Sequence, residues 1–512
     1  MKQTAILVMS FCLWASASPA AITATGNVHP NANPATWAAS DHVIVGYAMP
    51  GSLTIDGDSD LLSKHSSIGR IPSGVGIATV SGTGSTWTTT YAITVGSSGD
   101  GTLVITDSGE VSNGHGYIGK QANSRGAVIV NGGDSMWTSA ETLYIGEYGL
   151  GALNISSGGS VRNPYCLLGR EFGSTGAVTV SGPESTWTST GSVYVGEYGR
   201  GVLEITNGGT VSSLYSYAAH YSRHPGSTLT IPSSASIRVS GAGSTWTMSK
   251  NLYLGGDGDA RMDITNGGAV TCVDSRIGDH HSSTSAATVS GHGSIWTITD
   301  DLRVGNFGKA TLDIYDGGSV VIASTLTIDN DYDGDAFINM GSGGTLALPG
   351  DTSGSLTEFR RPIKGSEFLN VEEPIRYWNA STWAWTDISE ATYGVDYTLI
   401  YHTEGDLAGY TVLTVTAPVE PPTPGDTNND HIVDDDDYYN LIDQFGQFPG
   451  VLSADFNDDG MVDLADFIIM RENFGSGFPS APNAIPGSTT PEPTALTLLA
   501  LGALTVLKRP RR

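Results

Sequence analysis

The stretch "LYIGEYGLGALNISSGGSV", from Leu143 to Val161, carries the pattern that decides the fold. It reads as a short apolar strand ended by glycine, a brief linker, a strand of alternating side chains and a glycine turn. The stretch "LLGREFGSTGAVTVSGPESTW", from Leu167 to Trp187, repeats that order. In "ALNI" and "AVTV", branched apolar side chains recur at every second residue, as in strands with one buried face. The repeating unit is therefore about 25 residues long.

Tryptophans mark every second unit. They are Trp37, Trp87, Trp137, Trp187, Trp246 and Trp296, so the intervals between them are 50, 50, 50, 59 and 50 residues. The long interval contains "SLYSYAAHYSRHPGSTLTIPS", and an insertion that leaves the next repeat intact maps to a loop. We expect these tryptophans to pack against a coil corner or the coil between. The alternative is an exposed aromatic stripe that binds sugars.

A unit of about 25 residues with short strands and glycine corners has the size of one coil of a parallel β-solenoid. The sequence thus predicts a mainly β fold, with a β-solenoid of 50-residue double repeats over residues 21–348. This range holds roughly a dozen coils, and at ~4.8 Å per coil the rod would be ~60 Å long. A propeller is the runner-up, but about 25 residues is too short for a blade.

The pattern L-x-[VI]-G-x-x-G-x-G-x-L-x-I-x-x-G-G-x-V, ending in V-S-G-x-x-S-x-W-T, resembles the repeat shared by bacterial autotransporters and PEP-CTERM proteins. The resemblance covers about 310 residues of the chain. It implies an exported β-solenoid and no particular activity.

Composition and the N-terminus point to an exported, acidic protein. The 512 residues carry a net charge of -28, which repels phosphates and argues against a nucleic-acid partner. Residues 1–20 contain an apolar stretch after Lys2 and read as a secretory signal peptide. Besides Cys12 in that segment, Cys166 and Cys272 are far apart in sequence, so a disulfide framework does not hold the fold.

The repeat ends near Leu348, and residues 349–417 read as a small β module. A solenoid end exposes unpaired strand edges and needs a cap, so we expect this segment to cap the rod. The alternative is a separate carbohydrate-binding module that uses Trp378, Trp383 and Trp385 as a stacking platform. A proline-rich linker, 418–425, follows.

Two acidic twelve-residue loops, Asp426–Asp437 and Asp455–Asp466, are the strongest chemical signal. Both place oxygen ligands at positions 1, 3, 5, 9 and 12 and a backbone carbonyl at position 7, which suits calcium. The first set is Asp426, Asn428, Asp430, Ile432, Asp434 and Asp437; the second is Asp455, Asn457, Asp459, Met461, Asp463 and Asp466. Each loop runs into a short helical pattern. The sequence predicts two Ca²⁺ sites coupled to folding, against the alternative of a solvated acidic linker.

Residues 426–475 resemble a type I dockerin, a duplicated calcium loop-helix module. The resemblance implies a cohesin-like protein partner and attachment to a scaffold. The first loop has His431 where glycine is usual, and the partner-contacting positions differ between the halves, being Asp435-Asp436 in one and Leu464-Ala465 in the other.

A second linker, 476–490, leads to residues 491–512, in which Pro491-Glu492-Pro493 precedes a short apolar run and a basic end. This tail resembles a PEP-CTERM sorting signal with a short membrane helix. It implies membrane retention before processing by an exosortase-type enzyme and delivery to the surface. The alternative is a permanent tail anchor.

Solenoids also carry polysaccharide-cleaving sites, which need catalytic groups that converge on one face of the rod. One corner position holds Arg70, Lys120, Arg170, His220 and Asp279 in successive double repeats, interleaved with Ser97, Glu147 and Glu197. We interpret the alternating signs as mutually offsetting surface charges rather than a ladder that grips an anionic polysaccharide. His220, Asp279 and His281 are weak catalytic candidates, because histidine near a carboxylate can do acid-base work.

The sequence therefore favours an exported cell-surface or extracellular protein of structural or adhesive type with a calcium-dependent docking module. Its possible partners are a cohesin-like protein and an extracellular polysaccharide. The alternative is a lyase or glycoside hydrolase assembled through the same module.

Overall fold

The computed structural model describes residues 21–221, 233–329, 336–365, 375–379, 384–416, 425, 427, 433, 435–444, 454, 456, 462 and 464–473. The chain divides into two compact units, Met1–Pro421 and Pro422–Arg512, which we describe separately. The predicted signal peptide, both predicted linkers and the predicted sorting tail lie outside the described residues, apart from Gly425.

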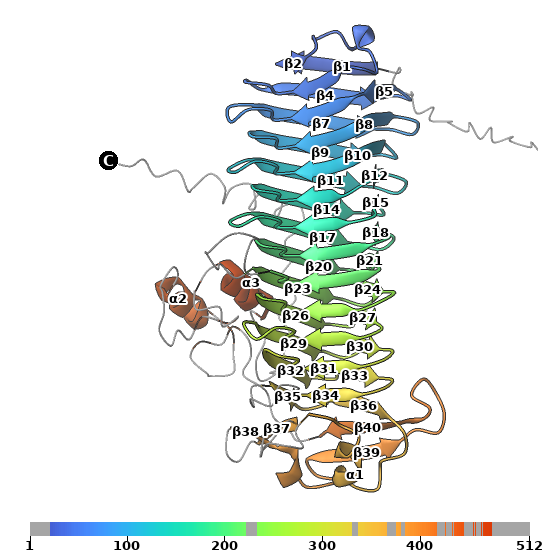
Figure 1. Cartoon of the computed structure of the whole chain (residues 1–512), viewed down its shortest axis with the longest axis vertical. Helices are drawn as coiled ribbons and strands as arrows, with labels where there is room; N and C mark the ends of the chain where they lie inside the picture. Colours follow the sequence, from blue (N-terminus) through green and yellow to red (C-terminus); the bar gives the residue numbers. More distant parts are fainter. Residues whose placement is uncertain are drawn as a thin grey trace, which may run out of the picture. The chain divides into compact units, whose positions relative to one another are not determined.

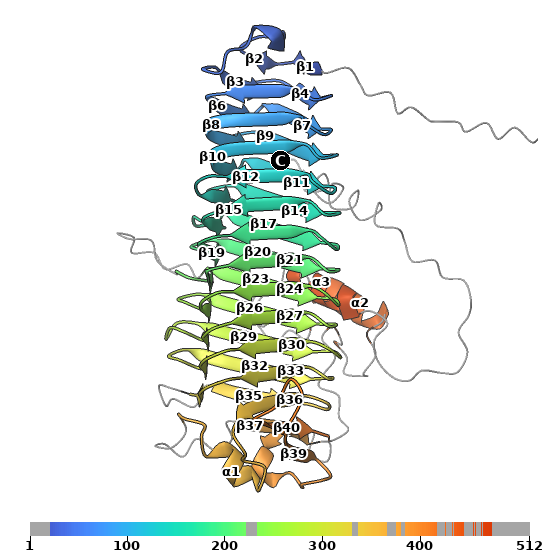
Figure 2. The same cartoon turned by 90° about the vertical axis from the view of Figure 1, so that its right-hand side faces the viewer.

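The first unit is a stack of coils, and each coil contributes to three ladders of parallel strands (Figures 1 and 2). Among the described residues, ladder 1 is a 15-stranded sheet made of β1 (Ala21–Gly26), β4 (Gly51–Asp56), β7 (Val75–Ser81), β9 (Asp100–Thr106), β11 (Arg125–Asn131), β14 (Leu150–Ser156), β17 (Thr175–Ser181), β20 (Arg200–Thr206), β23 (Ser234–Ser240), β26 (Asp259–Thr265), β29 (Thr284–Ser290), β32 (Lys309–Tyr315), β35 (Ala336–Met340), β37 (Ile375–Asn379) and β38 (Ala384–Asp387).

Ladder 2 contains β5 (Asp60–Ser63), β8 (Thr86–Val95), β10 (Glu110–Ile118), β12 (Met136–Ser139), β15 (Ser160–Asn163), β18 (Thr186–Ser189), β21 (Thr210–Ser213), β24 (Thr245–Met248), β27 (Ala269–Cys272), β30 (Ile295–Ile298), β33 (Ser319–Ile322) and β36 (Thr345–Pro349). Ladder 3 contains β3 (His42–Val45), β6 (His65–Ile68), the second halves of β8 and β10, β13 (Leu143–Ile145), β16 (Cys166–Leu168), β19 (Ser192–Val195), β22 (Tyr215–Ala218), β25 (Leu252–Leu254), β28 (Ser275–Ile277), β31 (Leu302–Val304) and β34 (Leu326–Ile328).

This arrangement confirms the predicted parallel β-solenoid, with about 12 coils in the described part of the chain. Burial alternates along the strands, as in β17, where every second residue is buried. The buried positions of the three ladders join into one apolar core that extends from Val43 to Val415. Stacking aliphatic side chains coil upon coil is what removes their surface from water.

Both ends of the rod depart from parallel pairing. At the first end, β1 pairs with β4 in antiparallel fashion, and β2 (Val28–His29) does so with β3. At the other end, β37 adds to β35, while β40 (Tyr410–Val415) pairs antiparallel with both β36 and β39 (Tyr397–Tyr401). The short helix α1 (Leu356–Arg360) buries Phe359 in the same core. The segment that contains α1, β37, β39 and β40 therefore continues the sheets and core of the rod, as a cap does, and does not fold apart from it.

A column of five tryptophans runs through the inside of ladder 2. Each lies in register with smaller aliphatic residues of the coils before and after it; Trp187, for example, lies between Val161 and Val211. The five are fully buried: Trp87, Trp137, Trp187, Trp246 and Trp296. These positions confirm that the tryptophans pack against the coil between, and large and small side chains alternate to fill the interior.

Trp37 does not belong to this column, although it keeps the 50-residue spacing. It follows a short 3-10 turn at Pro34–Thr36, is half-buried, and donates an indole hydrogen bond to the carbonyl of Asn31 at 3.0 Å. Trp37 therefore does not pack between two coils as the other five do, because the antiparallel strands of the first end displace the regular coil.

Buried polar side chains accompany the tryptophans. The Nε1 of Trp187 donates to Asn163 Oδ1 at 2.8 Å, and Asn163 Nδ2 donates to Ser189 Oγ of the next coil at 3.3 Å. Asn113 makes the equivalent bonds to Trp137 and Ser139. Buried polar groups are costly unless they are hydrogen-bonded, so these bonds specify how neighbouring coils are registered.

The serine of the repeated G-x-x-S-x-W motif makes two hydrogen bonds, one within its own turn and one to the preceding coil. The hydroxyl of Ser185 donates to the carbonyl of Ser181 and accepts from the backbone N–H of Gly158, one coil away, at 3.0 Å. Ser244 and Ser294 repeat both contacts. The motif thus closes its own turn and ties it to the turn of the preceding coil.

Glycine ends most of the ladder 3 strands, because the chain turns there with a positive φ. Gly169 has a φ of +60°, and a side chain on it would collide with the backbone of Arg200 in the next coil. In the coil before the insertion, Ala219 takes this position with a φ of 52°.

The described part of the second unit contains two helices, α2 (Asp435–Gln444) and α3 (Leu464–Asn473), which overlap the two predicted helical segments. Its small core is formed by Val433, Leu441, Ala454, Val462 and Met470. Val433 and Val462 hold the same position, the eighth, in the two predicted calcium loops.

Replacing a column tryptophan should destabilise the rod strongly. We expect Trp187→Ala to reduce the free energy of unfolding by about 3–5 kcal/mol, because it leaves a cavity and removes the hydrogen-bond donor to the buried Asn163 side chain. Trp37→Ala is the matched control and should cost clearly less, since Trp37 is only half-buried. Urea unfolding followed by far-UV circular dichroism measures both, and equal losses would contradict the column.

Candidate functional site

The corner that follows ladder 3 carries the charged column predicted from the sequence. Arg170 Nη1 lies 2.9 Å from Glu147 Oε1, and its Nε lies 3.7 Å from Glu171 and 3.9 Å from Glu197. One guanidinium therefore faces three carboxylates from its own and the neighbouring coils. These ion pairs support the interpretation that the column's charges offset one another, and they argue against a cationic ladder for polyanions.

Burial shapes the ionisation of this corner. Desolvation raises the pKa of Glu147, opposed by the nearby charges of Lys120 and Arg170. Within unit 1, the rings of ladder 3 further enclose the cations: Lys120 Nζ lies 3.8 Å from the centroid of the Tyr117 ring, and Arg170 Cζ lies 5.1 Å from that of Tyr144. Cation–π contacts of this kind stabilise charge at a partly exposed site.

The three weak catalytic candidates are placed near one corner, but they do not form an acid-base pair. Burial lowers the pKa of His220 to about 4, opposed by the charges of Asp257 and Asp279. The carboxylate of Asp279 accepts hydrogen bonds from Arg276 Nη1 at 3.2 Å and from Asn306 Nδ2 at 2.9 Å. His281 packs against Phe307, with ring centroids 5.3 Å apart.

A fourth residue, His280, makes the histidine–carboxylate contact that the sequence had suggested for its neighbours. Its Nδ1 lies 2.8 Å from Asp257 Oδ1, and the histidine side chain is well exposed. Asp257 was not singled out from the sequence, because no motif marks it; it is the parallel stacking of the coils that brings it beside His280. This pair is the best-formed acid-base geometry of the region.

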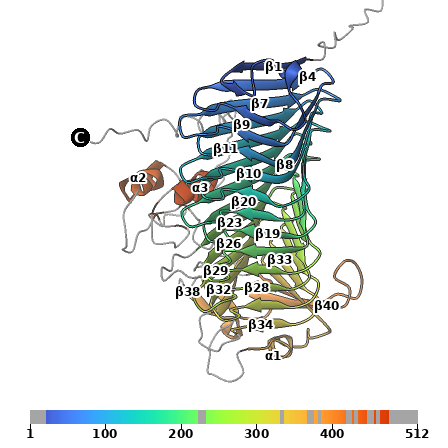
Figure 3. The same cartoon turned by 45° about the horizontal axis from the view of Figure 1, so that its top comes forward.

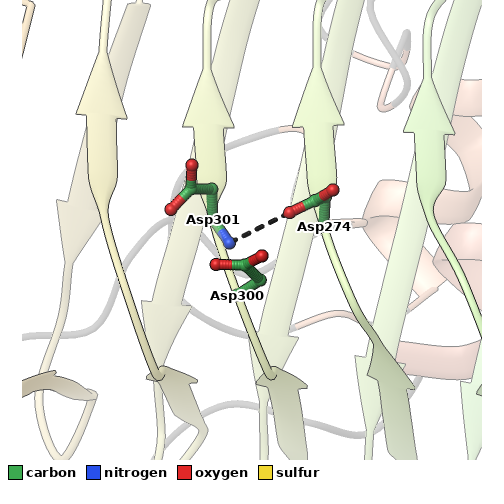
Figure 4. Close-up of side chains that lie close together, drawn as sticks. All are labelled: Asp274, Asp300 and Asp301. Carbon is green, nitrogen blue, oxygen red and sulfur yellow. Dashed lines mark hydrogen bonds between the residues drawn. The ribbon is translucent and has the colours of Figure 1, made fainter.

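A group of three carboxylates lies at the opposite end of ladder 3 strands: Asp274, Asp300 and Asp301 (Figure 4). Their oxygens approach within 4.8 Å of one another, and Asp274 Oδ1 accepts the backbone N–H of Asp301 at 3.2 Å. Desolvation tends to raise the pKa of Asp301, but hydrogen bonds from Ser324 and Thr325 together lower it overall. The hollow beside them, lined by Asp274, Ser275, Arg276, Asp301 and Arg303, has a volume of about 60 Å³. Sites for organic ligands commonly exceed about 300 Å³, so this hollow does not fit a sugar ring.

Tyrosines on the outer surface of ladder 3 form a feature that the sequence reasoning missed. The positions in register are Tyr117, Tyr144, Leu167, Tyr194, Tyr217, Tyr253, Arg276 and Arg303. Figure 3 labels three strands of ladder 3 along the rod, β19, β28 and β34. The signal was present, since "GYIG", "LYIG", "VYVG" and "LYLG" each place tyrosine two residues before the corner glycine.

His220 extends this aromatic surface around the corner. Its ring centroid lies 5.4 Å from that of Tyr194, 4.8 Å from that of Tyr217 and 3.9 Å from that of Tyr221. The neutral imidazole of His220, packed among phenol rings, therefore has a structural role. The lowered pKa of His220 agrees with this role.

The tryptophans of the cap do not form a flat platform. Trp378 and Trp385 face each other across the β37–β38 pair, with centroids 5.4 Å apart and ring planes 75° apart, and both are half-buried. Trp383 lies outside the described residues. This edge-to-face geometry presents no pair of coplanar faces to a sugar chain.

In the second unit, two of the twelve predicted calcium ligands lie within the described residues: Asp437 and Asp466. Each is fully buried at position 12 of its loop. Asp437 Oδ1 accepts the backbone N–H of Thr427 at 2.7 Å, and Asp466 Oδ1 accepts that of Phe456 at 2.7 Å. Both donors occupy position 2, so the two loops repeat the same closing contact.

The other predicted ligands lie outside the described residues: Asp426, Asn428, Asp430, Ile432, Asp434, Asp455, Asn457, Asp459, Met461 and Asp463. Among the residues that are described, no helix is long and apolar enough to cross a membrane, and the predicted membrane helix of the tail is not among them. Comparison with protein-family models, with curated proteins and with solved structures gave no match.

The depressed pKa of His220 predicts a specific loss of stability in acid. The unfolded chain binds a proton at His220 below pH about 6.5, whereas the folded chain does so only near pH 4. Stability should therefore fall as the pH drops from about 6.5 towards 4 and stay level above that window. His42, whose pKa burial also lowers to about 4, acts in the same direction.

We expect His220→Phe, which keeps an aromatic ring, to reduce the difference between urea midpoints at pH 7.5 and pH 5. His292→Phe, at an exposed position, is the control and should keep the wild-type difference. An unchanged difference in the His220 variant would contradict the assignment.

Proposed function

We propose that the chain is an exported, non-catalytic cell-surface protein of structural or adhesive type, in which the β-solenoid carries a calcium-dependent docking module. The observation that supports this most is the regularity of the coils combined with the repeated loop contacts of the second unit. In the described part of the rod, the candidate catalytic carboxylate Asp279 is held by structural partners.

A duplicated loop-and-helix pattern in the second unit supports the proposal of a docking module. Two loops of equal spacing each end in a buried aspartate that accepts the position-2 amide, and each leads into a helix of ten residues. A carboxylate at position 12 of each loop supplies the oxygen ligands that a hard cation such as Ca²⁺ prefers. Calcium would neutralise acidic groups that otherwise repel one another, and a cohesin-like protein is the proposed partner.

The sequences of the N-terminal and C-terminal segments support the proposal that the protein is exported to the cell surface. Residues 1–20 would direct export, and residues 491–512 would hold the chain at the membrane until an exosortase-type enzyme processes it. The rod would then be delivered to the cell surface or the extracellular space.

Calcium binding should depend on the two buried aspartates. In isothermal titration of the full chain, we expect Asp437→Asn and Asp466→Asn each to remove one equivalent of Ca²⁺, because each removes a charged ligand of one loop. Asp313→Asn, in ladder 1 of the rod, is the control and should leave the stoichiometry unchanged. Equal stoichiometry in all the variants would rule out these loops as the binding sites.

Attachment should require the second unit. When residues 417–475 are deleted, we expect the protein to be exported with its rod folded but to be recovered from the medium rather than from cells. Far-UV circular dichroism checks the rod, and immunodetection of cell and medium fractions measures the attachment. Retention on cells at the wild-type level would count against docking.

A polysaccharide-cleaving enzyme is the second candidate, and the His280–Asp257 pair beside His220 and Asp279 is the observation that favours it. Turnover on plant and algal polysaccharides, lost in His280→Ala, His220→Ala, Asp279→Ala or His281→Ala, would support that function and overturn a non-catalytic role.

A further inference from the structure

Three tyrosines, Tyr194, Tyr217 and Tyr253, form an uninterrupted outer column on three successive coils of ladder 3; we call it the tyrosine column. The rings of Tyr194 and Tyr217 stack with centroids 4.9 Å apart and planes 11° apart. Tyr217 and Tyr253 stack at 5.0 Å and 7°. Because the rings lie face to face along the rod, the column presents ring edges and hydroxyl groups to its surroundings.

The phenol groups of Tyr194 and Tyr217 stay protonated at neutral pH. Burial, reinforced by the neighbouring phenols, raises the pKa of Tyr217 to about 12, and burial also raises that of Tyr194. The three side chains are nevertheless partly exposed. A phenol hydroxyl can both donate and accept hydrogen bonds, and each one lies beside an apolar ring edge. The hydroxyl of Tyr253 already accepts one hydrogen bond, from Asn251 Nδ2 at 3.0 Å.

The charges that flank the column are paired within the protein. On one side Arg170 faces three carboxylates, and next to Tyr253 the guanidinium of Arg276 bonds Asp279 while lying 5.2 Å from the tyrosine ring centroid. His220, which touches two of the rings, is neutral above pH about 4. With a net charge of -28 on the whole chain, this surface does not attract a polyanion.

We propose that the tyrosine column binds a neutral, linear polysaccharide that lies along the rod. A neutral sugar unit alternates hydroxyl groups with apolar C–H edges, and the column offers the complementary hydroxyls and ring edges. The proposal rests on the proposed surface location, where such polymers are present, and it names the ligand class that the rod would contact there.

Repetition supplies the affinity that a single tyrosine cannot. The parallel register places one phenol per coil, about 4.8 Å apart, so a polymer aligned with the rod meets equivalent groups in succession. Weak contacts linked in this way add through effective concentration. Binding should therefore strengthen with the length of the sugar chain, and loss of one tyrosine should weaken it less than loss of all three.

The test is affinity electrophoresis of the full-length chain in gels cast with a neutral β-glucan, xylan, mannan or galactan, and with polygalacturonate as the anionic probe. The test variant is Tyr194→Thr/Tyr217→Thr/Tyr253→Thr, because Thr94 and Thr327 already occupy this register position at the two ends of the series. The control is Val104→Thr/Ile129→Thr on ladder 1, where Thr79 is in register.

We expect retardation by at least one neutral polymer and none by polygalacturonate. The triple variant should bind about tenfold or more weakly, whereas Tyr217→Thr alone and the control should retain most of the binding. Circular dichroism confirms that the variants fold. Retardation by none of the neutral polymers, retardation by polygalacturonate alone, or equal loss in the control would overturn the proposal.

This readout is independent of the docking module. A chain without residues 417–475 keeps the tyrosine column, so it should still be retarded even where calcium-dependent attachment fails. Conversely, a triple variant that attaches to cells but is retarded by the neutral polymers as strongly as the wild type would leave the docking proposal standing while the glycan proposal falls.

Discussion

The hydrogen-bond register between successive coils is the constraint on which the other features of this protein depend. Parallel pairing places equivalent residues one coil apart, so any residue repeated in the sequence becomes a column in space. The same register produces the buried tryptophans of ladder 2, the asparagine–serine bonds beside them and the stacked tyrosines outside ladder 3. A shift of one residue would exchange interior and exterior side chains along the strand, so each of these columns opposes a slip.

Much of the rod can be read from the sequence, because its information is periodic. Alternation within "ALNI" and "AVTV" predicts strands, which the structure has as β14 and β17, and the recurring glycines predict the turns between the strands of a solenoid. Trp37 shows the limit of this reasoning, since its spacing is regular while its coil is replaced by antiparallel strands. The His280–Asp257 contact could not be predicted from the sequence either, because the two residues are 23 positions apart and no local motif links them.

The tyrosine column illustrates a different gap. Tyrosine before an apolar residue and glycine is visible in four repeats, but the sequence does not tell whether such a ring faces a neighbour, the core or the outside. The stacking of Tyr194, Tyr217 and Tyr253, together with the pairing of Arg170 and Arg276, settles its orientation and its electrostatic setting. The proposed function thus separates two tasks, with repeated weak contacts along the rod and a metal-dependent contact in the second unit.

That separation implies that the rod holds its structure without calcium, while the second unit needs it. Hydrogen exchange of the full-length protein, measured by mass spectrometry with Ca²⁺ and with a chelator, tests this most directly. The account predicts slower exchange with Ca²⁺ in peptides from residues 426–475 and unchanged exchange in those from residues 51–349. Equal exchange rates in residues 426–475 with and without Ca²⁺ would contradict it. Faster hydrogen exchange in the rod when calcium is removed would contradict it as well.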